Sequence, residues 1–157
     1  MSELRAVMRR FPSGVAVVTT ILEGRPKGFT ATAFSSVSLE PPMVLICVNR
    51  RARTHPMISQ AGIFCVNLLA ARDRELAALF AERGDTNPFA GLTYERAVTG
   101  APVLPGAIGF VDCTVAEEYS AGTHTVFIGA VAACGTSAGK PLGYLDGAYR
   151  DFEIDVP

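Results

Sequence analysis

The chain has 157 residues, a formal net charge of −1 at pH 7, 49% hydrophobic residues and 18% charged residues. This length suits one domain spanning residues 1–157, and the near-neutral charge supplies no basic field to hold a nucleic acid. No apolar run approaches the roughly 18 to 20 residues of a membrane span, and the N-terminus lacks a signal-peptide apolar region, so we expect no membrane partner and a cytoplasmic location. The high hydrophobic content indicates extra apolar surface buried between subunits.

The chain opens with a short amphipathic helix, because Leu4, Val7, Met8 and Phe11 follow helical spacing before a Pro-Ser-Gly sequence ends it. Its apolar face is expected to pack on another element. The β-branched segment 15–21 and the returning segment 27–31 then predict a hairpin.

The next segment carries most of the functional signal. Small side chains surround Phe34 there, and they allow a flat ligand to lie close to the backbone. These small residues are Thr30, Ala31, Thr32, Ala33, Ser35 and Ser36. A Glu-Pro-Pro turn follows, and the unbroken apolar run at 43–48 predicts a buried strand.

A cationic loop connects that strand to a helix. The loop contains Arg50, Arg51 and Arg53, and it precedes Thr54, a candidate N-cap, with Pro56 in the first turn. Three guanidinium groups beside a helix N-terminus predict an anion site, for which phosphate is the best match. The alternative is that the arginines form only a solvated loop.

The later part of the chain alternates between helices and strands. Helical patterns mark 54–60, with Gly62 expected to close that helix, and 73–82, and the polar segment 83–99 predicts a loop. Strand patterns mark four further segments, namely 63–69, 110–119, 125–134 and a final hairpin at 141–152 with an Asp-Gly turn.

Segment 110–119 alternates in polarity, which predicts a half-buried strand with Asp112 on its polar face. About seven short strands with two or three short helices favour an antiparallel barrel or sandwich over a parallel α/β sheet. The chain contains neither GxGxxG nor GxxxxGK[ST], which excludes nucleotide binding by those two routes.

Few residues are suited to acid-base or metal chemistry. The four cysteines lie far apart in apolar contexts, so we expect buried reduced thiols. They are Cys47, Cys65, Cys113 and Cys134. The two histidines, His55 and His124, lack metal-binding spacing, so no metal site is expected. His124 stands at the mouth of a hairpin, as either a hydrogen-bonded structural residue or a functional one. Such a chain is better suited to hosting a cofactor than to acid-base catalysis.

Five segments occur in a characteristic order: FPSGVAVVTT, GFTATAFSSVSLEPPMVLICVNRRARTH, FCVNLLA, GTHTVFIGAV and PLGYLDGAY. This series resembles the short-chain flavin reductase family, the reductase components of two-component flavin-dependent monooxygenases. The resemblance implies a mainly β protein, a split β-barrel with a Greek-key core of the FMN-binding type, with two or three short flanking helices. It also implies a homodimer that binds flavin near its subunit interface. The implied activity is NAD(P)H:flavin oxidoreductase, which reduces FMN, or FAD in its place, with NADH or NADPH and supplies a partner monooxygenase.

The resemblance also implies three sets of site residues. Those against the isoalloxazine ring are Thr30, Ala31, Thr32 and Ala33, with Ser35 and Ser36 near the ribityl chain and phosphate. Those holding the phosphate are Asn49, Arg50, Arg53 and Thr54, with Phe80 and Ala81 approaching the same cofactor. His124 would contact the nicotinamide nucleotide, with Tyr149 beside it. Thr123 stands where the family often has aspartate. We therefore do not expect a carboxylate to orient His124 in this chain.

Three competing interpretations stay open at the level of sequence. The first is a split-barrel protein that binds flavin or haem without reductase activity. The second is an oxidase resembling the pyridoxamine phosphate oxidases, which share the barrel and FMN. The third is a structural dimer without a ligand. The choice between FMN and FAD, and between NADH and NADPH, is also open, as is whether the flavin stays bound or passes through as a substrate.

Overall fold

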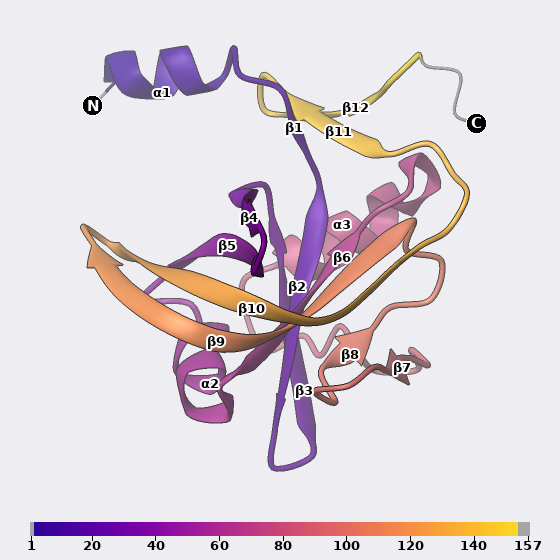
Figure 1. Cartoon of the computed structure of the whole chain (residues 1–157). Coiled ribbons are helices and arrows are strands. Elements are labelled where there is room, and N and C mark those ends of the chain that lie inside the picture. The colour runs from indigo at the N-terminus through magenta and orange to yellow at the C-terminus, as the bar shows by residue number, and fades with distance from the viewer. Residues whose placement is uncertain (1, 154–157) are drawn as a thin grey trace.

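A computed structural model describes residues 2–153. Its main element is a seven-stranded antiparallel sheet in the order β3-β2-β6-β9-β10-β5-β4, which curls strongly (Figure 1). The strands are β2 (Ala16–Leu22), β3 (Arg25–Ala31), β4 (Phe34–Leu39), β5 (Pro42–Asn49), β6 (Ile63–Leu68), β9 (Gly109–Ala121) and β10 (His124–Thr136). Strands β3 and β4 form the two edges, yet only residues 32–33 separate them in the chain. The curled sheet therefore brings its edges together as a barrel that is split between β3 and β4.

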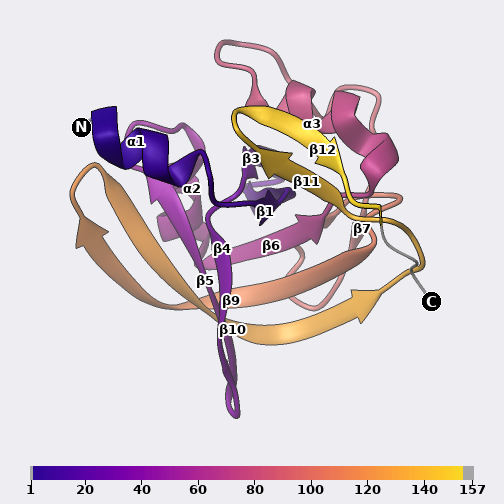
Figure 2. The same ribbon diagram turned by 90° about the horizontal axis from the view of Figure 1, so that it is seen from above.

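Two small sheets accompany the barrel. One has the order β1-β11-β12, and it lies above the barrel in Figures 1 and 2. Its strands are β1 (Ser13–Gly14), β11 (Leu142–Leu145) and β12 (Ala148–Asp151). The predicted Asp-Gly turn is confirmed, since Asp146 and Gly147 have φ angles of 53° and 79° as a tight hairpin turn requires. The other small sheet pairs β7 (Glu95–Arg96) with β8 (Pro102–Val103) inside and after the predicted loop.

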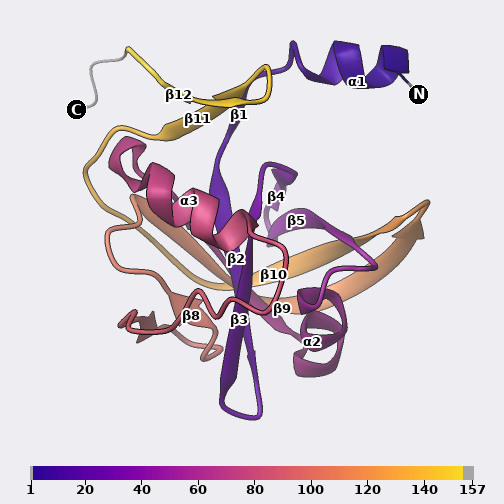
Figure 3. The ribbon, with the colours of Figure 1, turned by 180° about the vertical axis from the view of Figure 1, so that it is seen from behind.

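Three α-helices flank the strands, in agreement with the predicted number. They are α1 (Ser2–Met8), α2 (Thr54–Ala61) and α3 (Arg74–Ala81), the last preceded by a 3₁₀ turn (Ala71–Asp73). Gly62 ends α2 in the left-handed region, with its N–H donating to the carbonyl of Ile58, which confirms the predicted stop. Helices α2 and α3 both pack on the β2–β3 side of the sheet (Figure 3). No helix within residues 2–153 is long and apolar enough to cross a membrane.

The core has two parts. The barrel interior is filled by large side chains that include Ile46, Phe64 and Phe127. A second cluster lies beneath α3 and the small β1-β11-β12 sheet, and Phe80 and Leu142 belong to it. The packed barrel interior therefore provides a rigid scaffold for the surrounding loops and helix ends.

Four expectations from the sequence are wrong in detail. The run at 43–48 is buried only at alternate positions, because one face of β5 stays partly open. Strands β9 and β10 are long, with 13 residues each, and β1, β7 and β8 are short strands outside the main sheet that the sequence did not predict. The apolar face of α1 is exposed, with Leu4 at 65% and Val7 at 64%. Thr54 does not cap α2 with its side chain, since Arg53 occupies the cap position.

The polarity pattern of segment 110–119 predicts Asp112 on a polar, exposed face. This prediction is wrong, because Asp112 is completely buried. The segment after β7 folds over this face of β9, and Thr99 donates to the carboxylate from its backbone N–H at 2.8 Å and from its hydroxyl. An ionised carboxylate can stay buried when such donors satisfy it.

The cysteines follow the prediction only in part. All four are free thiols, and Cys65 and Cys113 are buried, but Cys47 is half-buried and Cys134 is exposed. Burial raises the pKa of Cys113 to about 12, and it raises the pKa of Cys65 further. The two buried thiols are therefore protonated at neutral pH and unreactive.

Gly129 of β10 offers a direct test of packing inside the barrel. A Cβ atom at this position would lie 2.5 Å from Cζ of Phe64 and 2.9 Å from Cβ of Cys113. We therefore expect Gly129→Ala to lower the free energy of unfolding by about 1–3 kcal/mol in urea titrations. Gly14→Ala is the matched control, since its new Cβ would meet nothing within 4 Å. Equal losses in both variants would contradict this account of the core.

Candidate functional site

Strands β5 and β10 build the wall of the candidate site. Their pairing sets Asn49 opposite His124, Cys47 opposite Val126 and Leu45 opposite Ile128. Residues directly opposite each other in an antiparallel pair share one face of the sheet. On this face all six side chains are exposed or half-buried, whereas the alternating residues of the other face fill the barrel interior. The sheet register thus brings Asn49 and His124 to the same outer surface.

The first cavity has a volume of about 600 Å³ and lies at the end of β5, between β3, the start of α2 and the segment that follows α3. We call it the α2 pocket. The predicted site residues that line it are Thr30, Asn49, Arg53, Thr54, Phe80 and Ala81. Lys27, Arg51 and Arg83 also line it, against a single acidic side chain, Glu82. The balance of charge in this pocket favours an anion.

Thr54 is the most informative residue of the α2 pocket. It is only 5% exposed, and its Oγ1 atom has no hydrogen-bond partner among residues 2–153. A buried hydroxyl without a partner costs stability, and native structures rarely leave one without a reason. This hydroxyl lies in the first turn of α2, where free backbone N–H groups also favour negative charge. A phosphate oxygen would satisfy both groups, so the residues present fit a phosphorylated ligand.

The turn before α2 separates the neighbouring arginines. Asn49 accepts a hydrogen bond at its Oδ1 atom from the N–H of Arg51, at 2.9 Å. The backbone N–H of Arg50 donates to the carbonyl oxygen of Thr123 at 3.0 Å, and the Arg50 guanidinium donates to the carbonyl of Gly122. Arg50 is therefore tied to the β9–β10 turn and does not line the α2 pocket, whereas Arg51 does.

Sequence reasoning missed Lys27 and Arg83 as lining residues, and it included Arg51 in the anion site only as one of three loop arginines. Adjacent side chains leave a tight turn in different directions, so the arginine cluster alone could not say which members share a cavity. Lys27 comes from β3, which the sheet topology alone brings next to α2. The basic loop was the only available signal for Arg51, and no signal pointed to Lys27.

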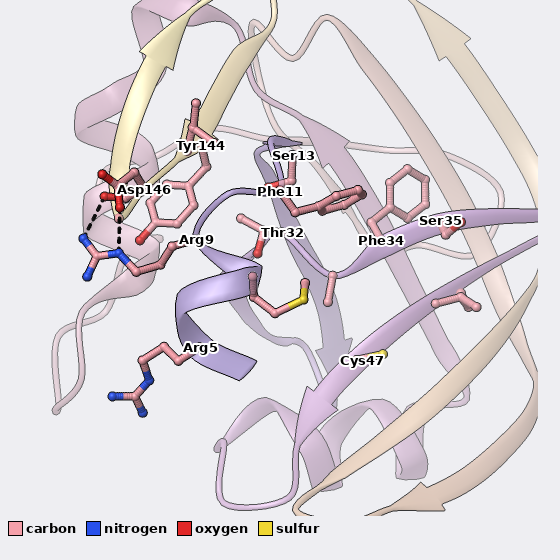
Figure 4. A pocket seen from close by; sticks show the side chains of 15 residues that line it. Arg5, Arg9, Phe11, Ser13, Thr32, Phe34, Ser35, Cys47, Tyr144 and Asp146 are labelled. Carbon is pink, nitrogen blue, oxygen red and sulfur yellow. Dashed lines mark hydrogen bonds and ion pairs between the residues drawn. The ribbon is translucent and has the colours of Figure 1, made fainter. Parts of the chain in front are cut away.

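A second cavity, of about 590 Å³, lies between α1, residues 32–35, β5 and the β11–β12 turn (Figure 4). We call it the α1 pocket. Thr32, Ala33 and Ser35 line it together with Cys47 and Tyr144. Since Leu45, Cys47 and Asn49 share one face of β5, the α1 pocket and the α2 pocket follow each other along that strand.

An exposed ion pair links the turn after α1 to the β11–β12 turn at the edge of the α1 pocket. Nε of Arg9 lies 2.7 Å from Oδ1 of Asp146, and Nη2 of Arg9 donates to the Asp146 carbonyl at 3.1 Å (Figure 4). The N–H of Asp146 donates in return to the carbonyl of Arg9 at 3.0 Å. The hydrogen bond from Arg9 lowers the pKa of the Asp146 carboxyl.

The residues expected against the isoalloxazine ring, 30–33, lie in different surroundings in the structure. The Thr30 hydroxyl donates to the carbonyl of Ala77 in α3 at 2.6 Å, and Ala31 is buried in the barrel core at 7% exposure. Thr32 and Ala33 follow beyond the end of β3 and line the other pocket, while Ser36 lines neither. Successive residues of a strand alternate between faces, so these four residues cannot present one flat surface of side chains.

His124 and Tyr149 occupy different parts of the chain. His124 begins β10 at the tip of the long β9–β10 hairpin, and its Nδ1 lies 2.9 Å from the Thr123 hydroxyl. Tyr149 belongs to β12 in the small upper sheet, where it packs against Tyr144 with ring centroids 5.7 Å apart. Burial raises the pKa of Tyr149. Figures 1 and 2 show the hairpin tip and β12 well separated, so one chain does not bring these two residues together.

Comparisons with known proteins agree with this architecture. Residues 8–153 match the flavin reductase like domain family. The reductase subunit HsaB of a flavin-dependent monooxygenase from Rhodococcus jostii is 36% identical over 152 residues, which cover 96% of this chain and 77% of that protein. FMN reductase (NADH) RutF from Variovorax paradoxus is 39% identical over 158 residues, covering 99% and 87%.

Solved structures extend the comparison to the fold. The NADH:FAD oxidoreductase SgcE6 of Streptomyces globisporus, in complex with NAD and FAD fragments, superposes with a TM-score of 0.91 at 34% identity, covering 99% of this chain and 94% of that one. The expected split barrel is confirmed by this likeness and by the sheet order. The chain belongs to the flavin reductase family, as its ordered motifs indicated.

Proposed function

We propose that this chain is a single-domain NAD(P)H-dependent flavin reductase that reduces FMN or FAD and supplies the reduced flavin to a partner monooxygenase. The observation that carries the proposal is the partnerless Thr54 hydroxyl, buried at a helix start inside a cationic pocket. The names of the relatives support the same activity, since they include an FMN reductase (NADH) and a monooxygenase reductase subunit.

The α2 pocket is the proposed site of the flavin phosphate. Asn49, Arg53 and Thr54 surround it, and Arg51 takes the place that the sequence suggested for Arg50. Each exposed basic group near a helix N-terminus contributes only about 0.3–1 kcal/mol, so binding depends on several of them acting together. Phe80 and Ala81 form the wall of this pocket on the α3 side.

The α1 pocket is the proposed site of the ring system. It follows the α2 pocket along β5, and small residues at 32, 33 and 35 allow a flat group to approach the backbone. Thr30 lines the α2 pocket, whereas Ala31 and Ser36 line neither pocket, so any contact they make with the flavin would come from the backbone of β3 and β4. Met8 of α1 and Leu45 and Cys47 of β5 give this pocket apolar surface that the ring would contact.

His124 is proposed to position the nicotinamide nucleotide. It shares the outer face of the sheet with Asn49, and the Thr123 hydroxyl at its Nδ1 leaves Nε2 available to a ligand. A bound flavin would supply the hydride-accepting group for a reduced nicotinamide, and His124 and the pocket residues would contribute by holding the two rings close and correctly oriented. Thr123 orients the imidazole without adding a negative charge, in place of the aspartate common in the family.

We also propose a homodimer. Six large apolar side chains on α1, directly after it and on β4 are exposed in the described part of the chain, and the outer face of β5 and β10 adds half-buried apolar residues. They are Leu4, Val7, Met8, Phe11, Val37 and Leu39, the last being 90% exposed. A partner chain that covers this surface could bring its Tyr149 toward His124. Sedimentation velocity would test this, and a monomer at micromolar concentrations would contradict it.

A cytoplasmic location is proposed as well. Four free thiols suit a reducing compartment, and NADH and NADPH are available there.

The competing function is a flavin-binding or haem-binding protein without reductase activity. Anaerobic mixing with NADH or NADPH distinguishes the two, with FMN, FAD and riboflavin supplied in turn. The reductase proposal requires oxidation of one reduced nicotinamide with at least one flavin. Flavin binding without any oxidation would favour the competing function.

Arg53 should discriminate between phosphorylated and unphosphorylated flavin. We expect Arg53→Ala to weaken FMN roughly tenfold while riboflavin changes less than about twofold, because riboflavin lacks the phosphate. Isothermal titration calorimetry measures both affinities. Arg74→Ala is the matched control, since Arg74 pairs with Asp151 outside the pocket. Equal losses for FMN and riboflavin would place the phosphate elsewhere.

Thr54→Val should have opposite effects on stability and binding. Removing the buried partnerless hydroxyl should stabilise the flavin-free protein by about 1–3 kcal/mol in urea titrations. The same change should weaken FMN roughly tenfold, because a charge-assisted hydrogen bond is lost. Thr114→Val, at an exposed position of β9, is the control. A variant with unchanged FMN affinity would remove Thr54 from the site.

His124→Ala should affect the nicotinamide nucleotide alone. We expect the apparent KM for NADH or NADPH to rise roughly tenfold, with the Kd for flavin nearly unchanged. Steady-state kinetics and a separate flavin titration measure the two quantities. Weaker flavin binding with an unchanged KM would assign His124 to the flavin instead.

A further inference from the structure

Arg53 is already paired within the chain. Its Nη1 atom donates to the carbonyl oxygen of Gly84 at 2.8 Å and lies 2.8 Å from Oδ1 of Asp85. Both partners belong to the segment that follows α3 and closes one side of the α2 pocket. Of the four ion pairs among residues 2–153, this is the one that engages a lining residue of that pocket.

This pair can open readily. The side chain of Asp85 is 96% exposed and that of Arg53 is 62% exposed, so water and salt screen their attraction. Residues 81–87 are all exposed, and no buried side chain anchors the segment there. Asp85 can therefore leave Arg53 without disturbing the core.

A phosphate in the α2 pocket would compete with Asp85 for the same guanidinium group. Carboxylates and phosphates bind the planar guanidinium in the same manner, through paired N–H donors. If Asp85 stays close, its negative charge repels the phosphate. If Asp85 moves away, the ion pair is lost. In both cases Asp85 weakens binding, and the repulsion increases with the negative charge of the ligand.

We propose that Asp85 is a specificity-determining residue, an internal competitor for Arg53 that discriminates between flavins by the charge on their tails. FMN ends in a phosphate monoester, which carries nearly two negative charges at pH 7 because its second pKa is about 6. The two phosphates of FAD are diesters with one charge each, and riboflavin has none. The total charge of the FAD tail is therefore also about two, so Asp85 disfavours both phosphorylated flavins and leaves riboflavin unaffected. This inference rests on the proposed function, since it requires the flavin phosphate at Arg53.

Affinity measurements with Asp85→Asn test the inference. The substitution keeps the size of the side chain and removes its charge. The Kd for FMN should fall roughly threefold to fivefold, the Kd for FAD should also fall, and the Kd for riboflavin should stay unchanged. Glu75→Gln is the matched control, because it removes an exposed carboxylate of α3 that does not line the pocket, and all three affinities should stay unchanged. The gain for FMN should shrink as salt concentration rises.

Two outcomes would overturn the role of Asp85. One is equal FMN affinity in the wild type and Asp85→Asn, and the other is an equal gain for all three flavins. Arg53→Ala separates this failure from a failure of the proposed function. Weaker FMN binding in Arg53→Ala without a gain in Asp85→Asn would retain the phosphate site and remove the competitor. No effect of either variant on FMN would remove both. Asp85→Asn should also lose its gain in an Arg53→Ala background.

Discussion

The antiparallel pairing of β5 with β10 is the constraint on which the candidate site depends. Its register sets Asn49, the last residue of β5, opposite His124, the first residue of β10. The same register sends alternate residues into the barrel, where Ile46 and Phe127 are fully buried. A slip by one residue would turn that apolar set outward and turn Asn49 and His124 inward, so core packing holds the site in register. The burial of apolar side chains that stabilises the barrel therefore also fixes the positions of Asn49 and His124.

The start of α2 shows a conflict between stability and function. A threonine hydroxyl buried without a partner weakens the flavin-free fold, and the nearby arginines gather like charges around it. Such local defects are expected where a protein keeps a place for a ligand. Asp85 balances part of this charge through Arg53, which links the state of the pocket to a segment that no buried side chain fixes. The buried Thr54 hydroxyl, the cluster of positive charges and the exposed segment with Asp85 thus meet at the start of α2.

Much of the fold could be predicted from the sequence because local patterns determine it. The hairpins, the Asp-Gly turn and the Gly62 helix stop each depend on residues close in the chain. Asp112 was misplaced because a distant segment, with Thr99, covers and satisfies it. The lining of the α2 pocket by Arg51 and not by Arg50, and the different surroundings of residues 30–33, depend on strand alternation and turn geometry in three dimensions. Motif order identified the family, but it could not determine which side chains share a cavity.

A crystal structure of the protein with bound FMN tests the central claim most directly. The account predicts the phosphate in the α2 pocket, within hydrogen-bond distance of the Thr54 hydroxyl and the Arg53 guanidinium, and the ring in the α1 pocket beside residues 32–35. A phosphate located away from α2, with the Thr54 hydroxyl still without a partner, would contradict it.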